Sequence, residues 1–136
     1  MEKWAGLLNR NSSANHAVAL GMARIENWDF GSDGVGCIAD ATAGTLAVKN
    51  PGVYFFTFTA SVTVSQAATL AFEVYKNGGT IDLGAEVKIT TANDVEQVTI
   101  HGAYMLRPGD VLAVYARGNG AYNVVMRYAQ FGIMSV

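Results

Sequence analysis

Few side chains in this sequence have the type and spacing that catalysis or metal binding requires. The two histidines, His16 and His101, are far apart in the chain, and neither has a neighbouring ligand. A nucleophile needs an adjacent base, and a transition-metal site needs a cluster of His, Cys or carboxylate ligands. The single cysteine, Cys37, also excludes an internal disulfide. The sequence therefore predicts a protein that is not an enzyme and binds no cofactor, with His101 at a surface or an interface.

Three acidic residues share one glycine-rich segment. Asp29, Asp33 and Asp40 lie between the expected strands at 17–25 and 45–49. Carboxylate oxygens are the ligands that Ca²⁺ prefers, but solvated loops carry the same residues. The sequence does not decide between a calcium site and a solvated loop, and we interpret the segment as a loop.

The composition is unusually poor in charge for a protein of 136 residues, a length that fits one domain. Charged residues make up 15% of the chain, against about 25% in typical globular domains. This deficit predicts that a partner, or copies of the chain itself, cover part of the surface. The net charge of -2 argues against nucleic acid as a partner. No apolar run is long enough to cross a membrane, so we expect no membrane partner.

The longest strand signal is at residues 52–64. Tyr54, Phe56 and Phe58 begin an apolar row at alternate positions, which predicts a strand with one face on a core. The opposite row starts with Val53 and Phe55 and then becomes polar. An apolar start on the second face requires a partner for Phe55 outside the core of its own sheet.

Similar patterns predict strands along the rest of the chain, and no segment sustains a helical period. Turn residues separate the strands, as in Asn77-Gly78-Gly79 and Arg107-Pro108-Gly109-Asp110. Regularly spaced strands and turns predict an all-β sandwich or barrel. The expected strands are residues 17–25, 45–49, 52–64, 69–77, 85–91, 96–106, 111–116 and 122–136.

The first fifteen residues are predicted to form an N-terminal arm, with the folded domain spanning residues 16–136. Trp4, Leu7 and Leu8 precede a polar run from Asn9 to Asn15. Three large apolar side chains are costly to leave in water, so we expect them to dock on a partner. Packing against the chain's own domain is the alternative.

Three blocks resemble the tumour-necrosis-factor-like superfamily, which includes the globular head of the complement first component. The first, Pro51 to Phe56, is similar to the Gly-x-Tyr-x-aromatic strand of that family. The second, Gly102 to Leu112, is similar to a strand that ends in Leu and a turn followed by Gly-Asp. The third, Phe131 to Val136, is similar to the terminal Phe-Gly strand.

This resemblance implies an all-β, two-sheet antiparallel jelly-roll sandwich of about ten strands that assembles as a compact homotrimer. In the family, one sheet turns its outer face to the threefold axis, so Phe55 would pack on two other subunits. Several matched positions are polar here where relatives often carry aromatic residues. Carried over by motif, the interface consists of Phe55, Thr57, Thr99, His101, Tyr128 and Gln130.

A structural or binding role follows from these expectations. We interpret the chain as a bacteriophage capsid decoration protein, made in the host cytoplasm and placed on the virion surface. Its partners would be its own copies and the major capsid protein or another virion component. Trp4, Leu7 and Leu8 of the arm would dock on the shell. The alternatives are a fibre-tip head that binds a cell-surface glycan, for instance through Trp28 and Tyr122, and the head of a bacterial collagen-like surface protein.

Overall fold

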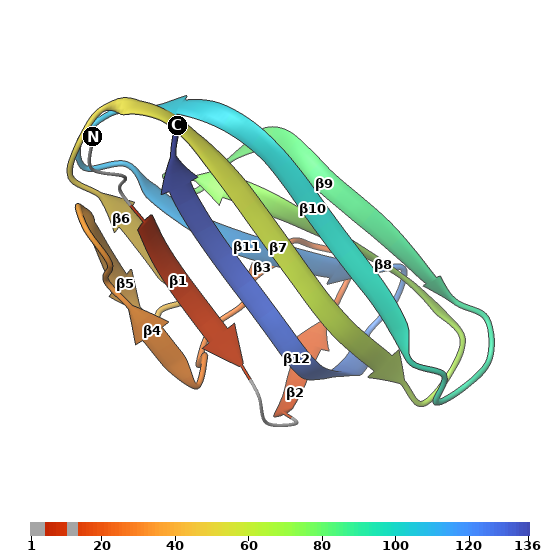
Figure 1. The fold of residues 1–136 in the computed structure, drawn as a ribbon. Helices are drawn as coiled ribbons and strands as arrows, with labels where there is room; N and C mark the ends of the chain where they lie inside the picture. The colour runs from red at the N-terminus through yellow and green to blue at the C-terminus, as the bar shows by residue number, and fades with distance from the viewer. Residues whose placement is uncertain (1–4, 11–13) are drawn as a thin grey trace.

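The computed structural model describes residues 5–10 and 14–136, and across them the chain forms twelve strands in two facing antiparallel sheets (Figure 1). The first sheet has the order β10-β7-β12-β1-β4, with β2 also paired to β12. The second has the order β5-β6-β11-β8-β9, with β3 also paired to β11. No helix that could span a membrane occurs in the described ranges. The strands are β1 (Ala5–Arg10), β2 (Ala14–Val18), β3 (Ala23–Arg24), β4 (Phe30–Ser32), β5 (Cys37–Asp40), β6 (Thr45–Val48), β7 (Gly52–Val64), β8 (Ala68–Lys76), β9 (Gly79–Ile89), β10 (Glu96–Leu106), β11 (Val111–Gly118) and β12 (Tyr122–Ser135).

The predicted all-β sandwich is confirmed, and the differences lie in its short strands. Residues 17–25, expected as one strand, divide into β2 and β3, which belong to different sheets. The chain changes sheets across 19–22, so one continuous pairing is impossible there. The stretch expected as a loop between 29 and 44 contains β4 and β5. Strands this short carry too few alternations to stand out from a glycine-rich background.

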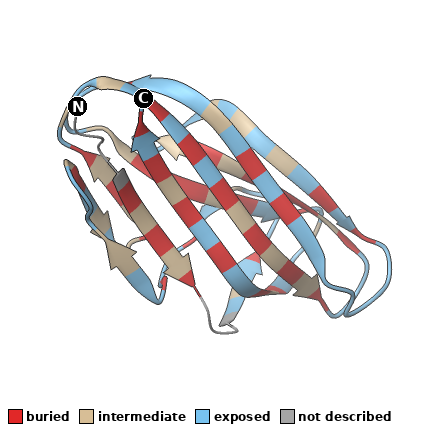
Figure 2. Ribbon diagram, viewed as in Figure 1, coloured by how far each residue is buried: buried red, intermediate tan, exposed pale blue. Residues whose placement is uncertain are grey.

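The core lies between the sheets, and the alternation of β7 shows how the sequence builds it. Tyr54, Phe56 and Phe58 are fully buried, whereas their neighbours on the other side of the strand are exposed or half-buried. Buried and exposed bands alternate in the same way along β12 and β10 (Figure 2). Phe58 packs edge-on against Trp28, with ring centroids 6.5 Å apart, and lies 5.6 Å from the ring of Phe72. Burying each such side chain contributes about 1.5–3 kcal/mol to the free energy of folding.

Both predicted turns are confirmed. Asn77 and Gly78 have positive φ angles of 53° and 81°, and Gly109 has a φ of 89°. The carboxylate of Asp110 accepts hydrogen bonds from the Arg107 amide at 2.8 Å and the Asn77 side chain at 2.9 Å. The two turns are thereby tied together at one end of the second sheet.

The N-terminal residues differ from the expected arm. Residues 5–10 form β1, which lies inside the first sheet between β12 and β4. Leu8 is fully buried in the core, and Leu7 is half-buried opposite Gly132. Trp4 lies outside the described residues. Over this range, pairing with two neighbouring strands satisfies the backbone and packs Leu8 on the chain's own domain, as the alternative expected. Docking of Trp4 and Leu7 on a partner stays a prediction.

Candidate interaction surface

All six residues predicted for the trimer interface lie on one surface, which we call the β7 face. It consists of the outward side chains of three adjacent strands. Opposed residues of an antiparallel pair point to the same side of the sheet, and His101 opposes Thr57 while Thr99 and Gln130 both oppose Thr59. The β7 face comprises Val53, Phe55, Thr57, Thr59, Ser61 and Thr63 of β7, Gln97, Thr99, His101, Ala103 and Met105 of β10, and Tyr128, Gln130, Gly132 and Met134 of β12.

The β7 face has an apolar end. Phe55, Met105 and Met134 are 49%, 60% and 44% exposed, and Val53 lies beside them. Phe55 and Met134 oppose each other across the β7–β12 pair. Together with Thr57, His101 and Ala103 they line an open hollow of about 490 Å³. Four large apolar side chains in contact with water at one end of a sheet form the kind of patch that marks an interaction site.

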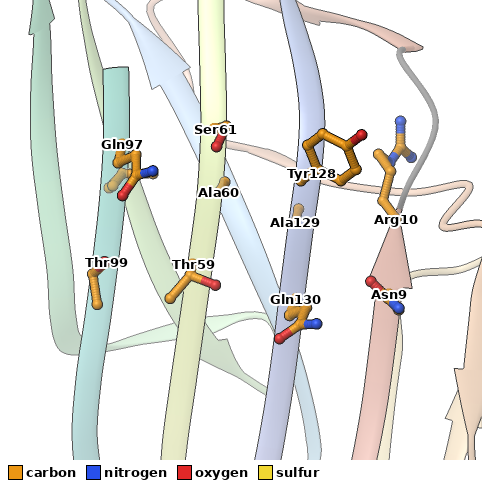
Figure 3. Close-up of a pocket in the computed structure, with 11 residues that line it drawn as sticks. Asn9, Arg10, Thr59, Ala60, Ser61, Gln97, Thr99, Tyr128, Ala129 and Gln130 are labelled. Carbon is orange, nitrogen blue, oxygen red and sulfur yellow. The ribbon is translucent and has the colours of Figure 1, made fainter. Parts of the chain in front are cut away.

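The opposite end of the β7 face is polar. A second open hollow, of about 430 Å³, lies over β10, β7 and β12 and reaches β1 (Figure 3). Its outward groups are amides and hydroxyls, among them Gln97, Thr99 and Gln130, and the exposed ring of Tyr128 stands at its side. The outward side chains at this end therefore offer uncharged hydrogen-bond donors and acceptors, and Arg10 lines the hollow from β1.

The absence of charge extends over the whole β7 face. None of its fifteen residues, as defined above, is Lys, Arg, Asp or Glu. The exposed Arg127 is next to Tyr128 on β12, where the β7–β12 register shifts between Met126 and Tyr128, so a charged side chain adjoins the β7 face there. Depletion of charge in a central region with aromatic and Met residues is the composition of protein interfaces.

The residues whose types could support catalysis or metal binding do not come together. His101 is exposed on the β7 face, whereas His16 opposes the buried Val124 on the inner side of β2. The Asp33 and Asp40 carboxylates each accept a backbone amide hydrogen bond of 3.0 Å, from Ala39 and Ala43. Within residues 5–10 and 14–136, no three His, Cys, Asp or Glu side chains form a group that could hold a metal.

The remaining thiol is not poised for reaction. Cys37 is buried, and burial, with a smaller contribution from Asp33, raises its pKa to about 11. A thiol with this pKa stays protonated at neutral pH and is a poor nucleophile.

Sequence reasoning missed two kinds of residue. Met105 and Met134 belong to the exposed apolar patch, and their outward positions in the alternation were the available signal. Arg10, in contrast, is almost completely buried at the end of β1, where its guanidinium donates to the backbone carbonyls of Glu26 and Asn27. An arginine in a polar run gives no sequence signal for such burial.

Known structures share this architecture. The Eiger TNF of S. frugiperda superposes with a TM-score of 0.70 at 13% identity, over 100% of this chain and 94% of that one. The globular domain of zebrafish complement 1qA superposes with a TM-score of 0.55 at 16% identity, over 96% and 94% of the two chains. The chain has the TNF-like jelly-roll fold. The family resemblance predicted from the sequence is thus confirmed for the fold, while neither the protein-family models nor the curated proteins include a match.

Proposed function

We propose that this chain is a non-enzymatic, self-assembling head module that forms a homotrimer through the β7 face. The observation that carries the proposal is the composition of that face, which exposes Phe55, Met105 and Met134 and contains no charged side chain. Covering such a surface stabilises the assembly by about 25 cal/mol per Å² of apolar area. It also buries no charged side chain, so no charge has to be desolvated. The TNF-like fold supports a threefold arrangement, since the sequence motifs of a trimeric family lie on these strands.

A closed cyclic assembly also explains why the patch would not drive open-ended association. In a homotrimer, each copy covers its neighbour, and the contact closes on itself. The interface residues proposed for each copy are Phe55, Thr57, Thr99, His101, Tyr128 and Gln130, with Met105 and Met134 added from the structure.

The narrower capsid-decoration role requires the same trimer and a free docking arm. The threefold symmetry supports such a role on an icosahedral shell. However, β1 is an interior strand and Leu8 belongs to the core, so these residues offer no free anchor. The observations support the trimer without the capsid, and a place on a virion stays a prediction from the sequence.

The two residues predicted to contact a glycan in the alternative function are not exposed on loops. Trp28 is buried against Phe58, and its indole nitrogen donates to the Ile25 carbonyl at 3.2 Å. Tyr122 is half-buried against the core. Neither ring is presented on a loop as a platform for a sugar.

The test is the solution mass, measured by light scattering across a dilution series. We expect a mass three times that of the 14.4 kDa chain. Thr57→Glu, which places three like charges in the contact, should reduce the mass to that of a monomer with an unchanged circular dichroism spectrum.

The matched control is on the outer side of the second sheet. Thr69 also points outward from a strand, and there it opposes Lys88, so Thr69→Glu introduces the same charge without repulsion. This variant should remain a trimer. A monomeric wild type, or the same loss of mass in both variants, would contradict the assignment of the β7 face.

A further inference from the structure

Two basic side chains, Arg10 and His16, lie on the inner side of the first sheet, on two strands that pair with the same edge of β12. β1 and β2 lie one after the other along the same edge of β12, and β12 changes register between them. Arg10 opposes the buried Ala129, and His16 opposes the buried Val124. Because opposed residues share a side of the sheet, both side chains point toward the interior.

Arg10 is a buried cation that donates to backbone carbonyls and is also acted on by the charge of Asp29. Its side chain is 1% exposed, and its Nη2 donates to the carbonyl oxygen of Glu26 at 3.0 Å and to that of Asn27. Burial lowers the pKa of the guanidinium, and the charge of Asp29 opposes that effect. The Glu26 carboxylate pairs with Arg24 at 3.6 Å instead. An arginine stays charged in proteins, so a positive charge remains at this position.

His16 therefore occupies a site that disfavours its protonated form. Its Nε2 atom is buried and has no hydrogen-bond partner among the described residues. It opposes the apolar Val124 on β12, the charge of Arg10 on β1 acts on it, and Asp29 in turn acts on Arg10. Burial, and secondarily the charge of Arg10, lower the pKa of His16 from 6.5 to about 4. At neutral pH the imidazole is uncharged and compatible with the site.

The strand that carries His16 is weakly held. β2 has five residues and, within the described part of the chain, pairs only with β12, whereas β12 also pairs with β7 along most of its length. Val18 is its one large apolar side chain in the core. One more hydrogen bond, from the Gly118 amide to the Ala19 carbonyl, follows the strand. A short strand with so little buried apolar surface opens at a lower free energy than the sheet it covers.

We propose that β2 is an acid-released flap, which detaches from β12 when His16 is protonated beside the buried Arg10 guanidinium. Release moves the imidazolium into water and away from the second cation. It also uncovers the backbone edge of β12 between Tyr122 and Met126, the residues that β2 pairs with. An uncovered strand edge can pair with another chain.

The sign of the pH dependence follows from the two protonation equilibria. The docked strand holds a histidine that titrates near 4, and the released strand holds one with the ordinary value of 6.5. The released form binds more protons between these pH values, so docking is most favourable above pH 6.5 and weakens as the pH falls toward 4. By linkage, the opening equilibrium increases about 30-fold from about pH 7.5 to about pH 5.

The experiment is hydrogen exchange followed by NMR on the full chain, with rates corrected for intrinsic exchange at each pH. Amides of Ala14–Val18 and their partners on β12 should lose about 30-fold in protection over that range. Amides that join β7 to β12 should keep theirs. His16→Asn, which cannot be protonated, should keep β2 protected at both pH values.

The second histidine provides the matched control. His101 is exposed on β10, so His101→Asn should retain the acid release seen in the wild type. Equal loss of protection in wild type and His16→Asn, or no loss in the wild type, would overturn the proposal. If His16→Asn fails to fold, the wild-type imidazole NMR titration decides: a midpoint near 4 supports the flap, and one near 6.5 overturns it. None of these outcomes depends on trimer formation.

Discussion

The outer surfaces of the two sheets differ although the same alternation of residues builds both. The β7 face lacks charged side chains and exposes Phe55, Met105 and Met134. The outer side of the second sheet, which we call the β11 face, carries charges on five of its strands. These are Arg24, Asp40, Glu73, Glu86, Lys88 and Arg117.

This difference shows that the charge of the outward-pointing residues indicates which face stays in contact with water. Removing a charged side chain from water without giving it a partner costs several kcal/mol of free energy. A surface that is covered in the assembly therefore excludes such residues. A surface in permanent contact with water keeps them, because they cost little there and maintain solubility. The inner faces of the two sheets cannot reveal this distinction, because both are apolar.

The largest expected effect separates the inner side of β7 from the β7 face. Phe56→Ala should reduce the free energy of unfolding by about 3–5 kcal/mol, because it leaves a cavity in the core. Phe55→Ala should leave monomer stability nearly unchanged and weaken the trimer. Urea unfolding at several protein concentrations, with light scattering at each, distinguishes the two effects. An equal loss of monomer stability in both variants would refute the assignment of Phe55 to a face exposed in the monomer.

A smaller effect is expected on the β11 face. The rings of Tyr75 and Tyr115 stack there with centroids 4.0 Å apart and an interplanar angle of 16°. Tyr75→Ala should lower stability by about 1 kcal/mol through loss of this contact. Its trimer mass should equal that of the wild type, as calorimetry and light scattering can establish. Dissociation of this variant would mean that the β11 face also takes part in assembly.

The smallest effect concerns salt. Because the β7 face has no ion pairs to screen, the trimer dissociation constant should change less than about twofold between about 0.05 and 0.5 M NaCl. Sedimentation of diluted samples measures this constant. Weakening by an order of magnitude would indicate that charged residues such as the exposed Arg127, rather than the β7 face, hold the copies together.

Several elements were predictable because their signals are local. The alternation at 52–64 identified Phe56 as core and Phe55 as outward, and the structure confirms both. The turn at Asn77 and Gly78 was predictable because few residues adopt positive φ. The six residues carried over from the family motif do share one face, although contact between subunits remains a proposal. The short strands β4 and β5 were missed because three or four residues carry little periodicity.

The sequence by itself determined the two-sided strands, the turns between them and the scarcity of charge, since each depends on residues within a few positions of one another. Only the tertiary structure decided which strands are neighbours. It placed β1 against β12 from the opposite end of the chain, which turned an expected arm into sheet. The same pairing buried Arg10 and set it near His16. Such lateral contacts depend on the free energy of the whole sandwich, and no local pattern encodes them.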